Sequence, residues 1–467
     1  MKKKRRGISF GTIFMLALTV IVVFAIATVL PKLSGDTVLK LNPQEIVTTV
    51  FSVVDLPELA LLEIPIENAA QPANDLTDGE INSQREGEQV SVPSPQTPMA
   101  IAPVQEAPLM TETEQPIKKQ ATLTLTGTVD FKKGLRQSEY NAESKSYDFR
   151  HLLAYVEDEM VGDITIATLE NTIAASSKVG DVNTVPQALI ALKNGGINVL
   201  SIGNEHILDY GIKGLTETSG EISRAGFSVV GVNTGGVQGQ HGLIVDAGNM
   251  KIGILSYVDN LTSTGEKQLK KEEAQNSILL YDGASVATHI GELRSSGAEV
   301  VVVMMHWGKD NQKEITSRQK EIAQQVANAG GDILLGGHTE RVFPIEYTTG
   351  IRGDGKQTQM LTVYSLGALL TQERGDANCG GVLLHVQIGQ DSQTQDVKIE
   401  KVTYTPTYIW RYQKEDKNHA YRVVASDQPA PEGMSGEQEK VKEKILGVVQ
   451  TSLGESPVTI REKKGLE

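Results

Sequence analysis

Short apolar runs of strand length recur along the chain from residue 121 onward, and segments with apolar residues at helical spacing lie between them. Two helical segments, 186–194 and 316–329, stop at glycine pairs, Gly195-Gly196 and Gly330-Gly331, which suit left-handed helix caps. Strands that alternate with helices in this way predict an α/β domain with a parallel sheet. The expected strands cover residues 121–126, 163–167, 198–202, 228–232, 251–257 and 299–305.

The later part of the chain has a different rhythm. Residues 360–365 and 381–388 resemble strands without long helices between them, which predicts a second sheet packed on the first. Apolar residues at helical spacing in 435–453 predict an amphipathic helix that closes the domain or docks a partner. We therefore expect a layered α/β sandwich in residues 119–412, followed by a C-terminal extension, 413–467, that contains this helix.

The N-terminus predicts a single membrane-spanning helix. Residues 2–6 are all Lys or Arg, and residues 8–30 contain no charged side chain, which is long enough to cross a bilayer. The positive-inside rule then places residues 1–33 as a cytoplasmic basic tip and signal-anchor in the cell membrane, with the rest of the chain extracytoplasmic. A cleaved signal peptide is the competing interpretation, because Ala25-Ile26-Ala27 has the small-x-small form of a cleavage site.

A linker separates this segment from the globular part. Residues 68–116 are rich in Pro, Gln, Glu, Thr and Ser and show almost no periodic apolar pattern, so they bury too little surface to offset the entropy of ordering. We therefore interpret residues 34–118 as a flexible extracytoplasmic stalk.

Charge and cysteine content exclude several kinds of partner and site. The formal net charge is −14 although five cations lie at the very N-terminus, which argues against binding to nucleic acid or to an anionic membrane surface. The single cysteine, Cys379, excludes an internal disulfide and a cysteine-based metal site, and is interpreted as a small buried side chain.

Three histidines each follow an apolar, strand-like run. His206 comes after residues 198–202, His306 ends the run that begins at 300, and His338 comes shortly after 332–335. Because parallel strands bring their carboxyl ends to one edge of a sheet, the three imidazoles are expected to meet there. Imidazoles that converge in this way predict a metal site.

Several motifs occur in a fixed order along the chain. They are Leu169-Glu170, the segment from Ser201 through Gly203-Asn204-Glu205-His206 to Gly211, His306-Trp307-Gly308, Gly337-His338-Thr339-Glu340 with Pro344-Ile345-Glu346, and Tyr364-Ser365-Leu366-Gly367. This order resembles the CapA family of capsule (poly-gamma-glutamate) synthesis proteins, whose domain is similar to calcineurin-like metallophosphoesterases, and the resemblance covers about residues 122–388. It implies a layered α/β/β/α sandwich.

The resemblance also implies a set of site residues, with departures from the family pattern. Gly127-Thr128 stands where the family has Gly-Asp, and His338-Thr339-Glu340 replaces His-Pro-His. His206 and His306 are the catalytic candidates. The metal-ligand candidates are Glu170, Asn204, His206, His306, His338 and Glu340.

The departures affect the number and kind of ions that the site would hold. Two divalent cations about 3.5–4 Å apart need a bridging carboxylate, which Thr128 does not supply. Asp130 lies two residues further on the same strand face and would compensate in part, while Glu340 is an oxygen ligand that suits Mn or Mg better than Zn. The residues leave two alternatives open, an altered site with a divalent metal (Mn, Zn or Mg) and a degenerate site with none.

Two functions follow from the resemblance. The first is a membrane-anchored extracytoplasmic CapA-like protein of capsule or poly-gamma-glutamate-type polymer biosynthesis or export, with a degenerate metal site. Its expected partners are the membrane, polymer synthase or export subunits, and an anionic envelope polymer or its precursor. The alternative is an active metal-dependent phosphoesterase or other hydrolase that acts on cell-envelope material. The departures at Thr128 and Glu340 favour the first, and enzymatic activity stays open.

Overall fold

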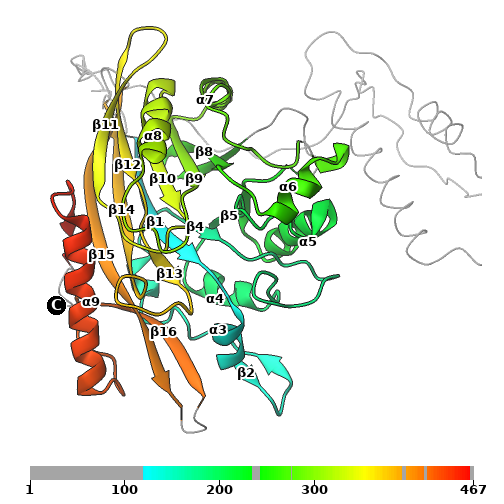
Figure 1. Cartoon of the computed structure of the whole chain (residues 1–467). Helices are drawn as coiled ribbons and strands as arrows, with labels where there is room; N and C mark the ends of the chain where they lie inside the picture. Colours follow the sequence, from blue (N-terminus) through cyan, green and yellow to red (C-terminus); the bar gives the residue numbers. More distant parts are fainter. Residues whose placement is uncertain (1–118, 234–241, 275, 392–395, 415–417, 463–467) are drawn as a thin grey trace, which may run out of the picture. The chain divides into compact units, whose positions relative to one another are not determined.

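The computed structural model describes residues 119–462 except 234–241, 275, 392–395 and 415–417 (Figure 1). By its internal contacts the chain divides into units 1–107 and 108–467, and all described residues belong to the second. The predicted anchor and stalk lie outside the described residues and stay predictions. Among the residues that are described, no helix has the length and apolar character needed to cross a membrane.

A nine-stranded sheet has β1 (Gln120–Val129) at its centre. β1 runs parallel to β4 (Ile164–Leu169) on one side and antiparallel to β14 (Gly380–Gln390) on the other. The order is β16-β15-β14-β1-β4-β5-β6, with β13 paired to β1 and β17 to β15. The remaining strands are β5 (Val199–Ser201), β6 (Ser228–Val230), β13 (Ala368–Leu370), β15 (Val397–Gln413), β16 (His419–Ala425) and β17 (Thr459–Ile460).

A six-stranded sheet packs against the first, in the order β11-β12-β10-β9-β8-β7. Its inner strands are parallel, and its two edge strands run antiparallel to their neighbours. The strands are β7 (Leu243–Ala247), β8 (Met250–Val258), β9 (Val300–His306), β10 (Ile333–Gly337), β11 (Ile345–Ile351) and β12 (Gln357–Val363).

The expectation that residues 360–365 and 381–388 lie together in the second sheet is therefore wrong. The run predicted at 360–365 joins the six-stranded sheet as β12, whereas the run at 381–388 becomes β14 and pairs with β1, as in Leu123↔Val386. β8 and β9, predicted in the first sheet, belong to the second. Long-range pairing decides this division, and local periodicity carries no signal for it.

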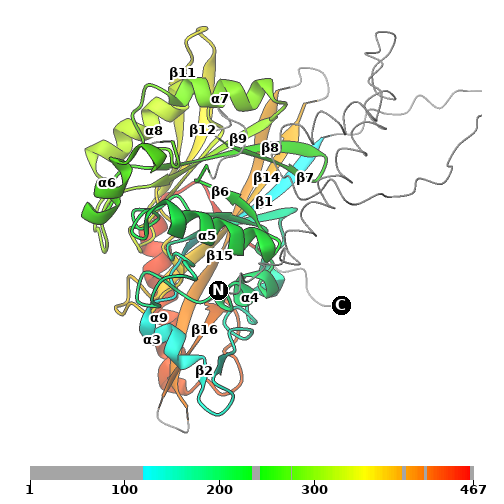
Figure 2. The same ribbon diagram turned by 90° about the vertical axis from the view of Figure 1, so that its right-hand side faces the viewer.

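Helices cover the outer faces of both sheets, so the described chain has the layered α/β arrangement that the sequence predicted (Figure 2). α4 (Ala188–Asn194) and α5 (Gly211–Arg224) pack on the nine-stranded sheet, and α7 (Val286–Ser295) and α8 (Ser317–Ala329) pack on the six-stranded sheet. An apolar core of side chains from both sheets fills the space between them. The other short elements are α3 (Lys133–Ser138), α6 (Ser263–Leu269) and the hairpin of β2 (Tyr140–Asn141) and β3 (Ser146–Tyr147).

The predicted helix ends are confirmed with one change. α8 begins after Thr316, whose hydroxyl and Gln319 form a capping box, and it ends at Ala329, with Gly330 as the left-handed cap at φ +91°. After α4, the left-handed residue of the glycine pair is Gly196 with φ +82°, while Gly195, the capping residue, has φ −70°.

The predicted C-terminal helix is α9 (Gly436–Leu453), which packs on β14 and β15. Ile445, Val449 and Leu453 face the core between the layers, whereas Val441, one helical turn before Ile445, is exposed. The domain limit predicted at residue 412 lies one residue before the end of β15. β16, which comes after this limit, pairs with β15 and belongs to the same nine-stranded sheet.

Candidate metal centre

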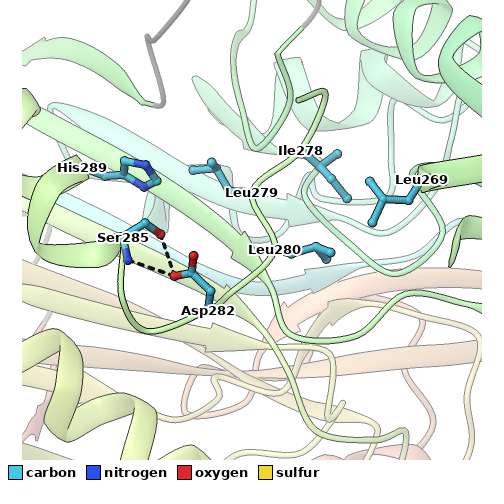
Figure 3. Close-up of a pocket in the computed structure, with 7 residues that line it drawn as sticks. All are labelled: Leu269, Ile278, Leu279, Leu280, Asp282, Ser285 and His289. Atoms are coloured by element: carbon cyan, nitrogen blue, oxygen red, sulfur yellow. Dashed lines mark hydrogen bonds between the residues drawn. The ribbon is translucent and has the colours of Figure 1, made fainter. Parts of the chain in front are cut away.

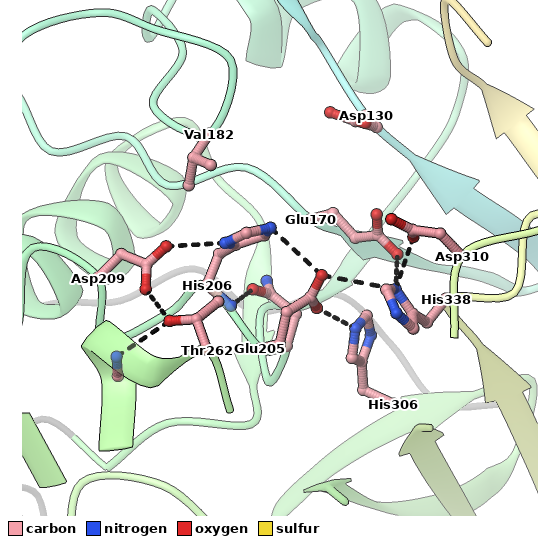
Figure 4. Close-up of polar contacts among 12 residues, drawn as sticks. Asp130, Glu170, Val182, Glu205, His206, Asp209, Thr262, His306, Asp310 and His338 are labelled. Carbon is pink, nitrogen blue, oxygen red and sulfur yellow. Dashed lines mark hydrogen bonds and ion pairs between the residues drawn. The ribbon is translucent and has the colours of Figure 1, made fainter. Parts of the chain in front are cut away.

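Four polar side chains meet where strands of the two sheets end (Figure 4). His306 is the last residue of β9, and its partner in register is Gly337 of β10, so His338 follows directly beside it. Glu170 follows β4, and its backbone N–H donates to Val129 at the end of β1. Glu205 lies in the loop after β5. Face-to-face packing of the sheets thus assembles residues that are far apart in the chain.

The tightest group consists of Glu170, His306 and His338. One potential ligand atom from each lies within 4.8 Å of the others. Glu170 Oε1 is 3.5 Å from His338 Nδ1, and the rings of His306 and His338 are 4.5 Å apart between centroids. Glu170 and His306 are buried, which removes bulk water as their partner. We call these three residues the triad.

Glu205 contributes a further carboxylate to the triad. Its Oε1 is 3.3 Å from His206 Nε2 and 3.5 Å from His338 Nδ1, and its Oε2 contacts His306 Nε2. Glu205 was not among the site residues predicted from the sequence. The available signal was its place inside the quoted motif, between Asn204 and His206.

His206 lies beside the triad and is held in a fixed orientation. Its Nδ1 is 2.7 Å from Asp209 Oδ2, and Thr262 donates its hydroxyl to the other oxygen of Asp209. The opposite nitrogen, Nε2, faces Glu205. A carboxylate that fixes an imidazole in this way prepares it for proton transfer.

Asn204, a predicted ligand, is engaged with the backbone. Its side-chain N–H groups donate to Leu169 O at 2.9 Å and Ile202 O at 3.3 Å, and its carbonyl oxygen accepts from His206 N at 2.9 Å. The residue is fully buried. The structure therefore does not bring Asn204 into the triad, and its amide instead holds the loop that carries Glu205 and His206.

Glu340 and Asp130 lie in a second cluster beside the triad. Lys132 Nζ is 3.1 Å from Asp130 Oδ2 and 3.7 Å from Glu340 Oε1. Thr128, at the position of the family's aspartate, accepts a hydrogen bond from the backbone N–H of His338 at 3.4 Å. Of the six predicted metal ligands, the structure thus brings three into the triad, with His206 adjacent and Glu340 in the second cluster.

Burial and mutual contacts perturb the protonation of the site. Burial raises the pKa of Glu170 to about 8 although His338 opposes it, and burial raises the pKa of Glu340 to about 7. Burial alone would lower the pKa of His338, but Glu170 and Glu205 raise it to about 9. Burial opposes ionisation of Glu205, yet the imidazoles of His306 and His338 hold its pKa below the usual range. The site therefore retains protons near neutral pH that a bound cation would displace.

The triad residues fit a divalent metal ion. Within the described residues, Glu170 Oε1, both ring nitrogens of His306 and His338 Nδ1 are buried and make no hydrogen bond of good geometry. Imidazole nitrogens and carboxylate oxygens are the ligands that Zn and Mn bind in proteins. An ion held by the triad, with Glu205 as a further oxygen donor, would satisfy Glu170 Oε1, His338 Nδ1 and one of the two ring nitrogens of His306.

A separate pocket of about 510 Å³ lies near α6 and α7 (Figure 3). Its polar groups already have partners, because Asp282 accepts from the backbone and hydroxyl of Ser285, and His289 Nδ1 is 2.7 Å from the Tyr257 hydroxyl. The pocket is otherwise apolar, so the chemistry is concentrated at the triad. Its lining residues are Leu269, Ile278, Leu279, Leu280, Asp282, Ser285 and His289.

Sequence comparison assigns the chain to a family. The profile of the bacterial capsule synthesis protein PGA_cap family matches residues 122–373, more than half of the chain. The chain therefore belongs to this family, as the motifs predicted.

Curated relatives agree with this assignment. The PGA biosynthesis protein CapA of Bacillus subtilis (strain 168) is 25% identical over 183 residues, which are 39% of this chain and 47% of that protein. The capsule biosynthesis protein CapA of Bacillus anthracis is 24% identical over 241 residues, 49% of this chain and 57% of that one. A probable polyglutamine synthesis accessory protein of Mycobacterium tuberculosis (strain CDC 1551 / Oshkosh) is 26% identical over 200 residues, 40% and 52% respectively. The chain spans about half the length of these relatives.

Solved structures resemble the chain more distantly. A calcineurin-like phosphoesterase, YfkN, of Bacillus subtilis has a TM-score of 0.35 at 15% identity and covers 72% of this chain and 98% of that one. A phosphatase of Mycoplasma pneumoniae has a TM-score of 0.34 at 14% identity, with 62% and 94% covered. At these TM-scores the likeness supports no conclusion about fold or activity.

Proposed function

We propose that this protein is an accessory component of capsule or poly-gamma-glutamate-type polymer biosynthesis and export. The support is the family match over residues 122–373, together with relatives named as capsule and PGA biosynthesis proteins. Residues 8–30 would anchor it in the cell membrane, with the α/β domain on the extracytoplasmic side next to polymer synthase or export subunits. An anionic polymer or its precursor would be the substance it handles.

The proposed working part of the domain is a single divalent metal ion held by Glu170, His306 and His338. The observation that carries this proposal is the convergence of their ligand atoms within 4.8 Å, buried and without good hydrogen bonds among the described residues. Such an ion would supply positive charge for an anionic group of the polymer or its precursor. Glu205 would complete the oxygen donors and orient the imidazoles.

A second candidate function, hydrolysis of a phosphoester in envelope material, is favoured by one observation. His206 is fixed by Asp209 at 2.7 Å and presents Nε2 to the triad side of the site, as a proton donor to a leaving group requires. In this case the ion would polarise the phosphoryl oxygens and acidify a water. His206 and His306 keep their predicted catalytic roles only under this alternative.

Genetic complementation tests the proposed function. A strain that lacks the gene receives the wild-type gene, His338→Ala, or the matched control His419→Ala, whose side chain is exposed on β16. We expect the deletion and His338→Ala to lose surface polymer, and the control to restore it, at equal protein levels by immunoblot. Normal polymer in the deletion strain would contradict the accessory role, whereas normal polymer with His338→Ala would contradict only the metal ion.

Two further measurements separate the finer proposals. Salt-washed membranes should retain the full-length protein, and a mature N-terminus at Thr28 would instead identify a cleaved signal peptide. Mn²⁺-loaded protein should leave bis(p-nitrophenyl) phosphate intact if the accessory role is right. Hydrolysis that disappears in His206→Ala would establish the phosphoesterase alternative.

A further inference from the structure

Lys132 places a positive charge among three carboxylates beside the triad. It precedes α3, shortly after β1 ends. Its Nζ is 3.1 Å from Asp130 Oδ2, 3.1 Å from Glu373 Oε1 and 3.7 Å from Glu340 Oε1. These carboxylates come from separate parts of the chain, so the tertiary structure builds a cage around one ammonium group. We call Asp130, Glu340 and Glu373 the carboxylate cage.

The carboxylate cage adjoins the candidate metal centre through the backbone. Val129 and Leu169 are paired residues at the ends of β1 and β4, so Asp130 and Glu170 leave neighbouring strands at the same point. Glu340 follows His338 by two residues. Two of the three triad residues, Glu170 and His338, thus each have a cage residue close by, as expected for two adjacent cation positions.

The cage needs a cation for physical reasons. Asp130 is 3% exposed and Glu340 2% exposed, and buried carboxylates of this kind are unstable as anions unless a positive charge compensates them. A second divalent ion would compensate them in a two-metal site. Here the compensation comes from the ammonium of Lys132, which offers three N–H donors to the three carboxylates. Thr128 meanwhile provides no carboxylate to bridge two ions.

We infer that the ammonium of Lys132 occupies the place of a second metal ion, so that this chain binds one divalent ion instead of two. The inference rests on the proposed metal ion in the triad, and it assigns Lys132 the role of excluding a second ion from the carboxylate cage. The carboxylate cage thereby contains the single positive charge of a side chain that is part of the protein, whereas a two-metal site would contain an exchangeable divalent ion there.

Metal stoichiometry of the detergent-purified full-length chain tests this. Four proteins are stripped with chelator, equilibrated with excess Mn²⁺, and measured by equilibrium dialysis and mass spectrometry of the metal. Lys132→Met removes the charge at similar length, Lys132→Arg keeps it, and Lys133→Met is the matched control on the adjacent exposed lysine. We expect one Mn²⁺ per chain in the wild type, Lys132→Arg and Lys133→Met, and two in Lys132→Met.

Thermal unfolding provides an independent readout. Without metal, Lys132→Met should melt at a lower temperature than the wild type because the cage carboxylates lose their cation. Added Mn²⁺ should raise its melting temperature more than it raises that of the wild type, because a second ion binds only the folded state. If circular dichroism shows that Lys132→Met does not fold, Lys132→Gln, which also lacks the charge, takes its place.

The possible outcomes distinguish this inference from the proposed function. Two ions in the wild type, or one ion in both the wild type and a folded charge-free variant, would overturn the role of Lys132 and leave the triad ion intact. No ion in any of the four proteins would overturn both. One ion in the wild type and two in Lys132→Met would support both.

Discussion

Gly336→Ala should damage both the fold and the metal centre. Gly336 lies in β10, two residues before His338. A Cβ at this position would lie 2.3 Å from Tyr364 O and 2.5 Å from Trp307 Nε1. Those two atoms form a buried hydrogen bond of 3.1 Å with each other. Neither is the free end of a flexible side chain, so β10 itself has to move.

The size of the effect follows from these contacts. Overpacking a core by one methyl group costs about 1–3 kcal/mol, and a buried indole N–H that loses its acceptor costs about 1–3 kcal/mol more, which gives roughly 2–6 kcal/mol in total. Movement of β10 also displaces His338, which follows that strand, from His306, the ladder partner of Gly337. Metal ligation tolerates displacements of only about 0.5 Å, so affinity for Mn²⁺ should fall together with stability.

Urea unfolding and Mn²⁺ titration of the full chain measure both effects. The matched control is Gly447→Ala in the exposed face of α9, where a new Cβ meets no atom within 4 Å. Alanine is the better helix former there, so this variant should gain about 1 kcal/mol. If Gly336→Ala unfolds at the wild-type urea concentration and binds Mn²⁺ with wild-type affinity, the packing argument for the end of β10 is wrong.

Three further predictions concern pH, loop support and the departures from the family pattern. Burial lowers the pKa of His385 from 6.5 to about 4. Between these two values the imidazole binds a proton in the unfolded chain but stays neutral in the folded chain. The free energy of unfolding should therefore be about 2 kcal/mol smaller at pH 5 than at pH 7. His385→Gln should lose that share of the pH dependence in urea titrations, and an unchanged profile would refute it. Asn204→Ala removes the hydrogen bonds that hold the loop after β5. This variant should lose about 1–3 kcal/mol of stability and bind Mn²⁺ more weakly. Wild-type stability and wild-type Mn²⁺ affinity would show that the amide is dispensable. Thr128→Asp combined with Glu340→His restores the family pattern and should raise the Mn²⁺ or Zn²⁺ bound at equilibrium; no gain in dialysis would contradict the interpretation of these departures.

The sequence predicted the histidines of the site because each follows a clear strand pattern. His306 ends the apolar run of β9, and His338 follows β10, which pairs with it in parallel. Parallel neighbours end at one edge, so their proximity follows from local patterns alone. His206 is different, because β5 belongs to the other sheet. Its approach to His306 depends on how two sheets pack, and the expectation of one shared sheet edge was wrong for this residue.

The acidic partners could not be predicted in the same way. Glu205 has no periodic pattern that separates it from a solvated loop carboxylate, and only the packing of its loop on both sheets brings it to three imidazoles. Lys132 likewise resembles an ordinary solvated lysine next to Lys133 in the sequence. Its role depends on Glu373, which lies 241 positions away along the chain. Contacts at such separations are set by tertiary structure, and local sequence does not encode them.

Backbone strain is concentrated where these side chains meet. Of the four described non-glycine residues with positive φ, three are Asn311 (φ +57°), His338 (φ +85°) and Glu340 (φ +56°). Asn378 links two of them, because its amide donates to Asn311 Oδ1 and to Glu340 Oε2. Such conformations cost about 1–3 kcal/mol each and persist only where the surroundings hold them. Glycine would remove the strain after β10 but would also remove the imidazole and the carboxylate. These backbone conformations therefore lower stability while they direct His338 into the triad and Glu340 toward Lys132. This favours a functional over a purely structural role for both residues.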